Sequence, residues 1–207
     1  MNNADICVVI PMKHPVQSKM RLNRALSDEQ RAALAIHLFR NTLAFFRREF
    51  PQLTLLVVTP SAWVAATARQ FGCEILLEAS PAGLNQALVR ATRWSLRNRF
   101  SRQLIIPADI EQLKRDEILR LLAEPAQVVI ANARDGGTNA LLCTPPDAIP
   151  FCYGEQSGRE HARAAARLHL SCARLTLNYL SADIDHPQDL PPDLYYAPVA
   201  DKVLPYA

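Results

Sequence analysis

Short apolar runs alternate along this chain with segments that have helical periodicity, and this alternation limits the folds that the chain can adopt. Strands that are apolar on both faces and are separated by helices form a mainly parallel sheet with helices on both sides. We therefore predict an α/β fold with a mainly parallel, mixed sheet. The predicted strands are DICVVI (5–10), LTLLVVT (53–59), EILLE (74–78), QLIIP (103–107), QVVIAN (127–132), NALLC (139–143) and ARLTLNYL (173–180).

The segments between these runs predict helices with recognisable ends. The first helix begins at Ser27, where Gln30 completes a capping-box pattern, and its apolar residues recur at i, i+4 spacing. A shorter helix starts at Ser61 and stops at Gly72, a residue type that is common just past helix ends. Further helices are predicted at 84–99, 114–123 and 157–169.

Length and composition indicate one globular domain. We assign residues 1–190 to this domain. Residues 191–207 contain four prolines and show no helical or strand period, and we assign them to a tail that lies on the surface or on a partner. The net charge of +3 argues against general nucleic-acid or membrane binding. No apolar run reaches the roughly 18 residues of a membrane helix, and the first residues read as a strand rather than a signal peptide. We therefore expect a cytoplasmic protein.

The cysteines predict free thiols. There are five of them, they lie far apart, and they include no C-x-x-C pair. Cys7 and Cys143 lie within apolar runs, where a reduced cysteine packs as a small hydrophobe. We therefore expect no zinc site and a reducing compartment.

Chemically capable residues follow several of the predicted strands. In an open parallel sheet, ligands bind at the carboxyl ends of the strands, so residues in these positions can share one rim. The candidates are Lys13, Lys19 and Arg21 after the first strand, Gly83 and Asn85 after the third, Asp109 after the fourth, Thr138 between the paired strands, Gly154 and Ser157 after the sixth, and Asp183 and Asp185 after the last.

These residue types suit phosphoryl or nucleotidyl transfer. Lysine and arginine neutralise phosphate oxygens, and carboxylates bind Mg²⁺, a hard cation that prefers oxygen ligands. Asp183 and Asp185 point the same way if their segment is extended, as two ligands of one metal should. Structural interpretations also stay open: the loop lysines could be solvated, Asp109 and Asn85 could cap helices, and Asp185 could organise a turn. His161 is interpreted as a surface or core residue.

Six separated motifs resemble those of one family. IPMKHPVQSKMRL, GLNQAL, PADI, GTNALL, IPFCYGEQSGREH and DIDHPQDL occur in the order found in the CofC/FbiD guanylyltransferases of coenzyme F-420 biosynthesis, over residues 5–190. The resemblance implies a nucleotidyltransferase fold of the glycosyltransferase-A type and the use of GTP and Mg²⁺. It also implies conversion of a small phosphorylated acid into its guanosine-diphospho derivative, with release of pyrophosphate. The acid is 2-phospho-L-lactate, phosphoenolpyruvate or 3-phospho-D-glycerate, and a homodimer is compatible with the family.

The resemblance further implies how GTP is bound. Lys13, Lys19 and Arg21 match the basic loop that grips the GTP phosphates, and they are therefore expected to be catalytic. Gly83 and Asn85 match the nucleotide-binding turn.

Metal and acid sites are implied in the same way. The expected metal ligands are Asp109, which is also expected to be catalytic, Asp183 and Asp185. The residues expected to bind the phosphorylated acid are Thr138, Gly154 and Ser157. A helix that begins near Ser157 would offer free N–H groups to the phosphate of that acid.

The chain departs from the family pattern on the substrate side. Met20 stands where a small hydroxyl residue is usual, and Ile110-Glu111 replaces Leu-Pro after Asp109. Glu155-Gln156 replaces Pro-Gly and adds a carboxylate near an anionic substrate. These departures leave the identity of the acid open.

Two other functions also stay open at the level of the sequence. A related nucleotidyltransferase that acts on a sugar phosphate or a cofactor precursor could use the same lysines and aspartates, and a sugar-sized pocket would indicate it. A non-catalytic, nucleotide-binding regulatory module would be indicated by a missing acidic ligand, and all three aspartates are present.

Overall fold

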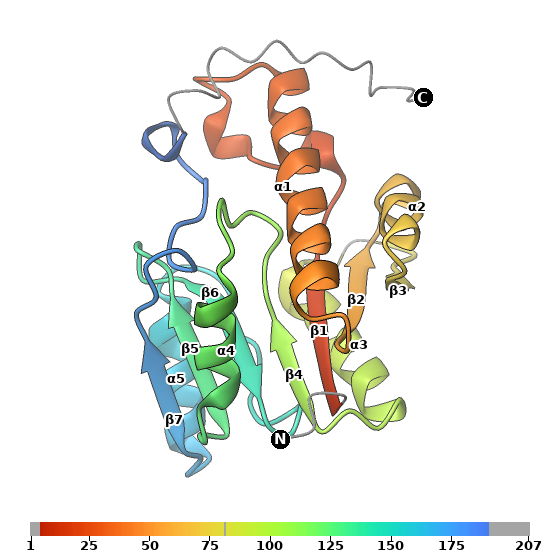
Figure 1. Ribbon diagram of the computed structural model, residues 1–207. Coiled ribbons are helices and arrows are strands. Elements are labelled where there is room, and N and C mark those ends of the chain that lie inside the picture. Colours follow the sequence, from red (N-terminus) through yellow and green to blue (C-terminus); the bar gives the residue numbers. More distant parts are fainter. Residues whose placement is uncertain (1–4, 81, 191–207) are drawn as a thin grey trace.

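The computed structural model describes residues 5–80 and 82–190 (Figure 1). These residues form a seven-stranded sheet with the strand order β3-β2-β1-β4-β6-β5-β7. The tail predicted at 191–207 lies outside the described residues. The strands are β1 (Ile6–Pro11), β2 (Thr54–Thr59), β3 (Glu74–Leu77), β4 (Arg102–Ile105), β5 (Val128–Asn132), β6 (Thr138–Cys143) and β7 (Cys172–Leu175).

The pairing confirms a mainly parallel, mixed sheet. β1 pairs in parallel with β2 and β4, β2 with β3, and β5 with β7. β6 alone runs antiparallel to its neighbours β4 and β5. Because β6 runs in the opposite direction, its first residue, Thr138, lies at the edge of the sheet where the parallel strands end.

Helices cover both faces of the sheet, as predicted (Figure 1). In β1, the side chains of Ile6, Val8 and Ile10 pack into the core on one face, and those of Cys7 and Val9 pack into the core on the other. The first core includes residues of α1 (Asp28–Glu49), α2 (Ala62–Gln70) and α4 (Arg115–Ala123), and the second includes residues of α3 (Leu84–Arg97) and α5 (Ser157–Arg167).

The last predicted strand is too long, because β7 ends at Leu175 rather than at residue 180. Beyond it, the N–H groups of Tyr179 and Leu180 donate to the two carboxylate oxygens of Glu117 on α4, at 3.1 and 2.8 Å, instead of to a neighbouring strand. Leu177 and Leu180 nevertheless pack into the core, which explains why this segment is as apolar as a strand.

The predicted helix starts are confirmed more closely than the ends. Ser27 and Gln30 form the expected capping box at the start of α1. α3 and α5 each end two residues before the predicted bound, because Arg99 and His169 adopt left-handed φ angles of 62° and 56°. A left-handed residue just past the C-cap turns the chain away from the helix axis.

The state of the cysteines and the hydrophobicity of the helices were both predicted from the sequence. All five cysteines are free thiols, and Cys7, Cys73 and Cys143 are buried. Within the described ranges, no helix combines the length and the hydrophobicity needed to cross a bilayer.

Candidate active site

A cavity of about 400 Å³ lies over the carboxyl ends of β1 to β4. Its walls include the basic loop after β1 (residues 12–24), the start of α3, and the segments that follow β2, β3 and β4. Glu78 lies at one end of the cavity and Asp109 at the other, because β3 and β4 are separated in the sheet by β2 and β1. This is the edge where open α/β sheets bind their ligands.

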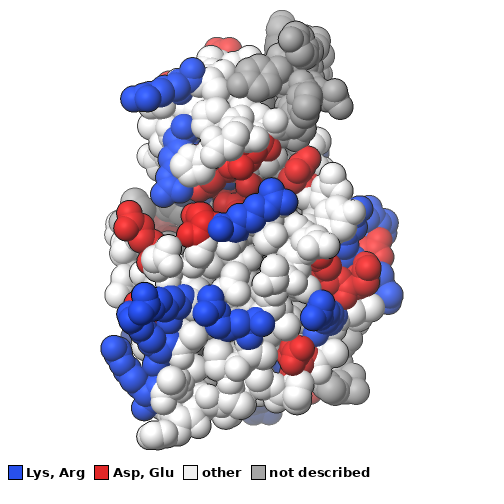
Figure 2. Space-filling view, turned by 90° about the vertical axis from the view of Figure 1, so that its left-hand side faces the viewer, with Lys and Arg blue, Asp and Glu red and all other residues white. Residues whose placement is uncertain are grey.

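Three aspartates meet at one end of this cavity. The carboxylates of Asp109, Asp183 and Asp185, here called the acidic triad, each offer an oxygen within 4.8 Å of the others. The backbones that carry them are joined, since Ile184 N–H donates to Asp109 O at 3.2 Å. Ile184 is buried among leucines of α1 and the basic loop, so the aspartates on either side of it share the opposite face, as predicted. Acidic side chains gather in a hollow on the face shown in Figure 2.

The structural interpretations of these aspartates are not supported. Lys114, not Asp109, occupies the N-cap position of α4. The turn after Asp185 is organised by Asp189, whose Oδ2 accepts from the N–H groups of Asp185 and His186 at 3.1 and 2.7 Å.

The triad is partly shielded from solvent. Burial raises the pKa of Asp183, while Asn139 on β6 donates to its Oδ1 at 2.9 Å and opposes that rise. Asp109 Oδ1 is buried and has no hydrogen-bond partner among the described residues. A buried acceptor without a donor is costly, so this oxygen is suited to a cation ligand.

Lys19 is held by this acidic triad rather than solvated. Its Nζ lies 2.8 Å from Asp109 Oδ2 and 3.1 Å from Asp185 Oδ1, and its side chain is only 5% exposed. Burial of the ammonium disfavours its charge, but the charges of Asp109 and Asp185 outweigh this, and the pKa of Lys19 is raised. The backbone of Lys19 has a left-handed φ of 55°, a conformation that costs energy for a residue with a Cβ.

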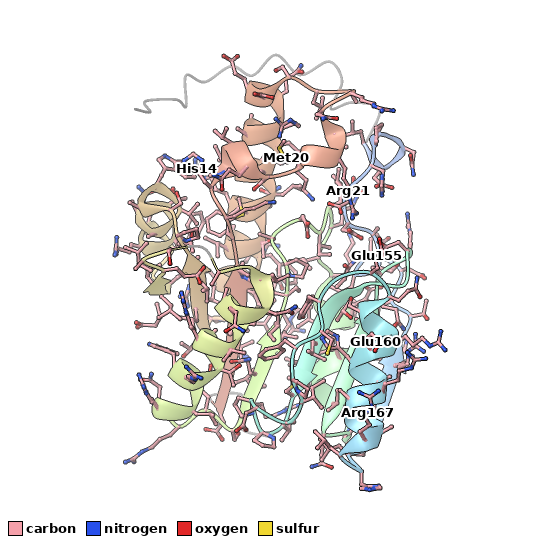
Figure 3. All side chains as sticks on the ribbon, turned by 180° about the vertical axis from the view of Figure 1, so that it is seen from behind. His14, Met20, Arg21, Glu155, Glu160 and Arg167 are labelled. Carbon is pink, nitrogen blue, oxygen red and sulfur yellow. The ribbon has the colours of Figure 1, made fainter. Side chains whose placement is uncertain are left out.

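The basic loop is tied to α1 by a buried arginine. Arg31 donates to Ser18 O at 2.8 Å and pairs with Asp28 at the start of the helix. Lys13 is exposed and lines the cavity, whereas Arg21 lies outside the lining and pairs with Asp185 at 3.0 Å. Met20 is exposed and begins the short 3-10 turn Met20–Leu22, where Figure 3 labels it together with Arg21.

Thr138 and Ser157 belong to a buried hydrogen-bonded chain that also contains His161. Ser157 Oγ lies 3.1 Å from Thr138 Oγ1, which lies 3.1 Å from His161 Nδ1. Cys152 N–H donates to His161 Nε2 at 3.0 Å, so Nδ1 carries the ring proton and donates to Thr138. Burial lowers the pKa of His161 to about 4, and the ring is therefore neutral at pH 7. His161 is a core residue, one of the two interpretations that the sequence left open.

One hydroxyl proton of this chain stays available. The ring N–H and the two O–H groups supply three protons, and the two contacts between the three side chains use two of them. Whichever way the hydroxyls of the buried residues Thr138 and Ser157 are oriented, one of their protons is not used by these two contacts.

The expectation of free N–H groups at the start of α5 is wrong, because the N–H groups of its first four residues all have backbone acceptors. Ser157 N–H donates to Gly154 O at 3.3 Å, and Gly158 N–H donates to Gly136 O at 3.2 Å. Gly154 itself has a φ of 146°, and no atom lies within 4 Å of where a Cβ would be. The loop before α5 therefore offers open space rather than unpaired helix amides.

Asn85 does not cap α3, because Gly83 occupies the N-cap position. The Asn85 side chain instead makes two hydrogen bonds with the backbone of Tyr153, accepting at 2.9 Å and donating at 3.2 Å. Asn85 thereby joins α3 to the loop before α5, and it does not line the cavity, whereas Gly83 does.

Sequence reasoning missed three residues of the site. Glu78 lines the cavity, Asn139 binds Asp183, and Arg31 anchors the basic loop. A charged residue at the end of the apolar run EILLE was the available signal for Glu78. Asp183, which Asn139 binds, and Ser18, through which Arg31 holds the basic loop, lie on other elements, so no local pattern marks these two contacts.

Residues 6–194 match the sequence profile of the family described as guanylyl transferase CofC like. The chain belongs to this family. A 3-phospho-D-glycerate guanylyltransferase of Colwellia psychrerythraea (strain 34H) is 48% identical to this CofC-like chain, over 88% of the chain and 88% of the relative. A phosphoenolpyruvate guanylyltransferase of Rubrobacter xylanophilus is 31% identical, over 89% and 91% respectively.

Solved structures confirm the fold of this CofC-like chain. A nucleotidyl transferase from Methanothermobacter thermautotrophicus superposes with a TM-score of 0.62 at 12% identity, over 89% of this chain and 93% of that one. The predicted nucleotidyltransferase fold is therefore confirmed. At this level of identity, the likeness concerns the fold alone.

Proposed function

We propose that this CofC-like protein is a guanylyltransferase that transfers GMP from GTP to a small phosphorylated acid and releases pyrophosphate, as a step of coenzyme F-420 biosynthesis. The observation that carries the proposal is the acidic triad with Lys19 at one end of a cavity over the strand ends. We favour 3-phospho-D-glycerate as the acid, because the relative that acts on it is 48% identical over 88% of the chain.

The triad suits a magnesium ion. All three side chains supply oxygen donors, and Asp109 Oδ1 is buried without a partner in the described part of the chain. Asp109, Asp183 and Asp185 would hold the ion. When bound, Mg²⁺ would offset the negative charge of the phosphates as they are brought together.

The basic residues would bind the triphosphate. Lys19 is buried beside the triad and can neutralise phosphate oxygens there, while Lys13 reaches the cavity from its exposed position. Arg21, paired with Asp185, would extend the positive charge outward. Bringing two anions together requires positioning and electrostatic stabilisation more than proton transfer.

The reaction needs no general base. The second pKa of a phosphate monoester is about 6, so the phosphate of the acid is largely dianionic at neutral pH. One of its oxygens forms a bond to the α-phosphorus of GTP, the bond from that phosphorus to the bridging oxygen of the β-phosphate breaks, and pyrophosphate leaves. Neutral His161 is thus not required as a base.

The acid would bind near the start of α5. Thr138 or Ser157 retains one hydroxyl proton for an anionic group, and Gly154 leaves open space beside them. Asn85 would act indirectly, by holding the Tyr153 loop in place.

The test is pyrophosphate release measured across four nucleoside triphosphates and the three candidate acids. We expect release only with GTP, and fastest with 3-phospho-D-glycerate. Sugar 1-phosphates are included because turnover with one of them would support the related nucleotidyltransferase instead. Release with no combination, while GTP still binds, would support the regulatory module.

A further inference from the structure

Glu78 is the acidic residue at the end of the cavity away from the acidic triad, among the described residues that line it. Its side chain is 6% exposed. Its backbone N–H donates to Thr59 O at 2.9 Å and joins it to the end of β2. Arg90 of α3 donates to Glu78 Oε1 at 3.1 Å, and no other group in residues 5–80 and 82–190 donates to this carboxylate. One carboxylate oxygen therefore keeps its full accepting capacity beside the cavity.

The walls next to Glu78 are apolar and open. Pro60, Leu84 and Ala87 line this part of the cavity, and Leu84 is 43% exposed although it is apolar. Gly83 has a φ of 86°, and no atom lies within 4 Å of where its Cβ would be. Apolar surface with a single polar group at its end suits a flat heteroaromatic ring held by its edge.

The two ends of the cavity are far enough apart to bind different parts of a nucleotide. Glu78 follows β3 and Asp109 follows β4, and these strands are three positions apart in the sheet. Three strand spacings are about 14 Å. If the triphosphate lies at the triad, as the proposed function requires, the base of the nucleotide reaches the end that contains Glu78.

We infer that Glu78 is the specificity-determining residue for the base, and that it selects guanine. A carboxylate only accepts hydrogen bonds, so it pairs best with a base edge that has two adjacent donors. Guanine has such an edge in N1–H and the 2-amino group. Adenine and cytosine each place a ring acceptor beside their amino group, and uracil has a single N–H between two carbonyls. Arg90 forms an ion pair with Glu78, and it therefore positions the carboxylate and balances its charge.

The inference is tested with three purine nucleotides that differ at position 2. Initial rates are measured with GTP, ITP, which lacks the 2-amino group, and XTP, which has a carbonyl there. The wild type is compared with Glu78→Gln, and with Glu74→Gln as a control, since Glu74 is an exposed glutamate at the other end of β3.

We expect the wild type to prefer GTP to ITP by about tenfold or more in kcat/KM, because a charged hydrogen bond is lost with ITP. A glutamine at position 78 can accept from N1–H and donate to the 2-carbonyl of xanthine. Glu78→Gln should therefore raise the ratio of XTP to GTP turnover by about 100-fold, because a charged hydrogen bond to guanine is lost and a neutral one to the 2-carbonyl of xanthine is gained. The KM for the acid and the thermal unfolding midpoint should change little, and Glu74→Gln should match the wild type.

The outcomes separate this inference from the proposed function. A wild type that uses GTP and ITP within twofold of each other overturns the inference even if Glu78→Gln fails to fold. An unchanged XTP to GTP ratio in a folded Glu78→Gln overturns it as well. A wild type that releases no pyrophosphate with any nucleotide refutes the proposed function, and the inference fails with it.

Discussion

The ammonium nitrogen of Lys19 lies 2.8 Å from Asp109 Oδ2, although the two residues are 90 positions apart in the sequence. Lys19 also contacts Asp185, so a cation of the protein itself lies between two carboxylates of the acidic triad. This contact links the basic loop and the acidic triad in one site.

Asp109→Asn should abolish turnover while the fold is kept. The amide keeps the shape of the side chain but removes a charge that would bind the metal and that pairs with Lys19. Turnover and the rise in unfolding midpoint on addition of Mg²⁺ should both be lost. Asp147→Asn is the matched control, because Asp147 is exposed and follows β6, at the opposite edge of the sheet. Activity of Asp109→Asn within a few fold of the wild type would exclude this residue as a metal ligand.

Lys19→Ala should weaken the interaction with the triphosphate. Removing one buried charge from the phosphate site should cost about 1.5–3 kcal/mol of binding or of transition-state stabilisation. Calorimetric titration with GTP and steady-state rates measure the two contributions. Lys13→Ala, which removes an exposed lysine of the same loop, should cost less. Normal GTP affinity together with normal turnover in Lys19→Ala would show that Lys19 pairs with the aspartates but contributes to neither GTP binding nor catalysis.

Combined substitution of the two hydroxyl residues should affect the acid and not the nucleotide. Ser157→Ala with Thr138→Val removes the donor that the buried chain leaves available. The KM for the phosphorylated acid should rise by about tenfold, the value of one hydrogen bond to a charged group, while the KM for GTP stays nearly constant. Thr176→Val, at an exposed threonine, is the control. Equal increases in both constants would mean that these residues serve the nucleotide or the fold.

Stability should depend on pH through His161. Burial lowers the pKa of His161 to about 4, below the ordinary value of 6.5, so between these values the unfolded chain binds a proton that the folded chain does not. The free energy of unfolding therefore falls as the pH falls from 6.5 toward 4, by up to about 3 kcal/mol. His161→Gln should remove this part of the pH dependence in urea unfolding.

Asp183 has the opposite effect on the pH dependence of stability, and it is present in both the wild type and His161→Gln. Burial raises the pKa of its carboxyl, so the folded state binds its proton first as the pH falls. The difference between wild type and His161→Gln therefore isolates the histidine. Equal losses of unfolding free energy between pH 7 and pH 5 in the two proteins would contradict a neutral, buried His161.

Local patterns predicted much of the fold. The capping box of Ser27 and Gln30 depends on residues three positions apart, and alternation around Ile184 is enough to place Asp183 and Asp185 on one face. The end of β7 was mispredicted, because Glu117 on another element binds the amides that follow it. Local composition cannot reveal such a partner.

In the candidate site, too, some features follow from the sequence pattern, whereas others depend on contacts between distant residues. Acidic and basic residues after strands were correctly expected to gather at one edge, because topology alone brings strand ends together. The pairing of Lys19 with the aspartates and of Asn85 with Tyr153 joins residues far apart in the chain. Glu78, which follows β3, meets its partner Arg90 of α3 only in the folded protein.

Identification of the product tests the central claim most directly. The protein is incubated with GTP, Mg²⁺ and 3-phospho-D-glycerate, and the mixture is examined by phosphorus NMR and mass spectrometry. The account predicts a guanosine-diphospho derivative of the acid, with two coupled phosphorus signals and one equivalent of pyrophosphate. Formation of a nucleotide sugar when sugar 1-phosphates are supplied, with no adduct from 3-phospho-D-glycerate, phosphoenolpyruvate or 2-phospho-L-lactate, would contradict it.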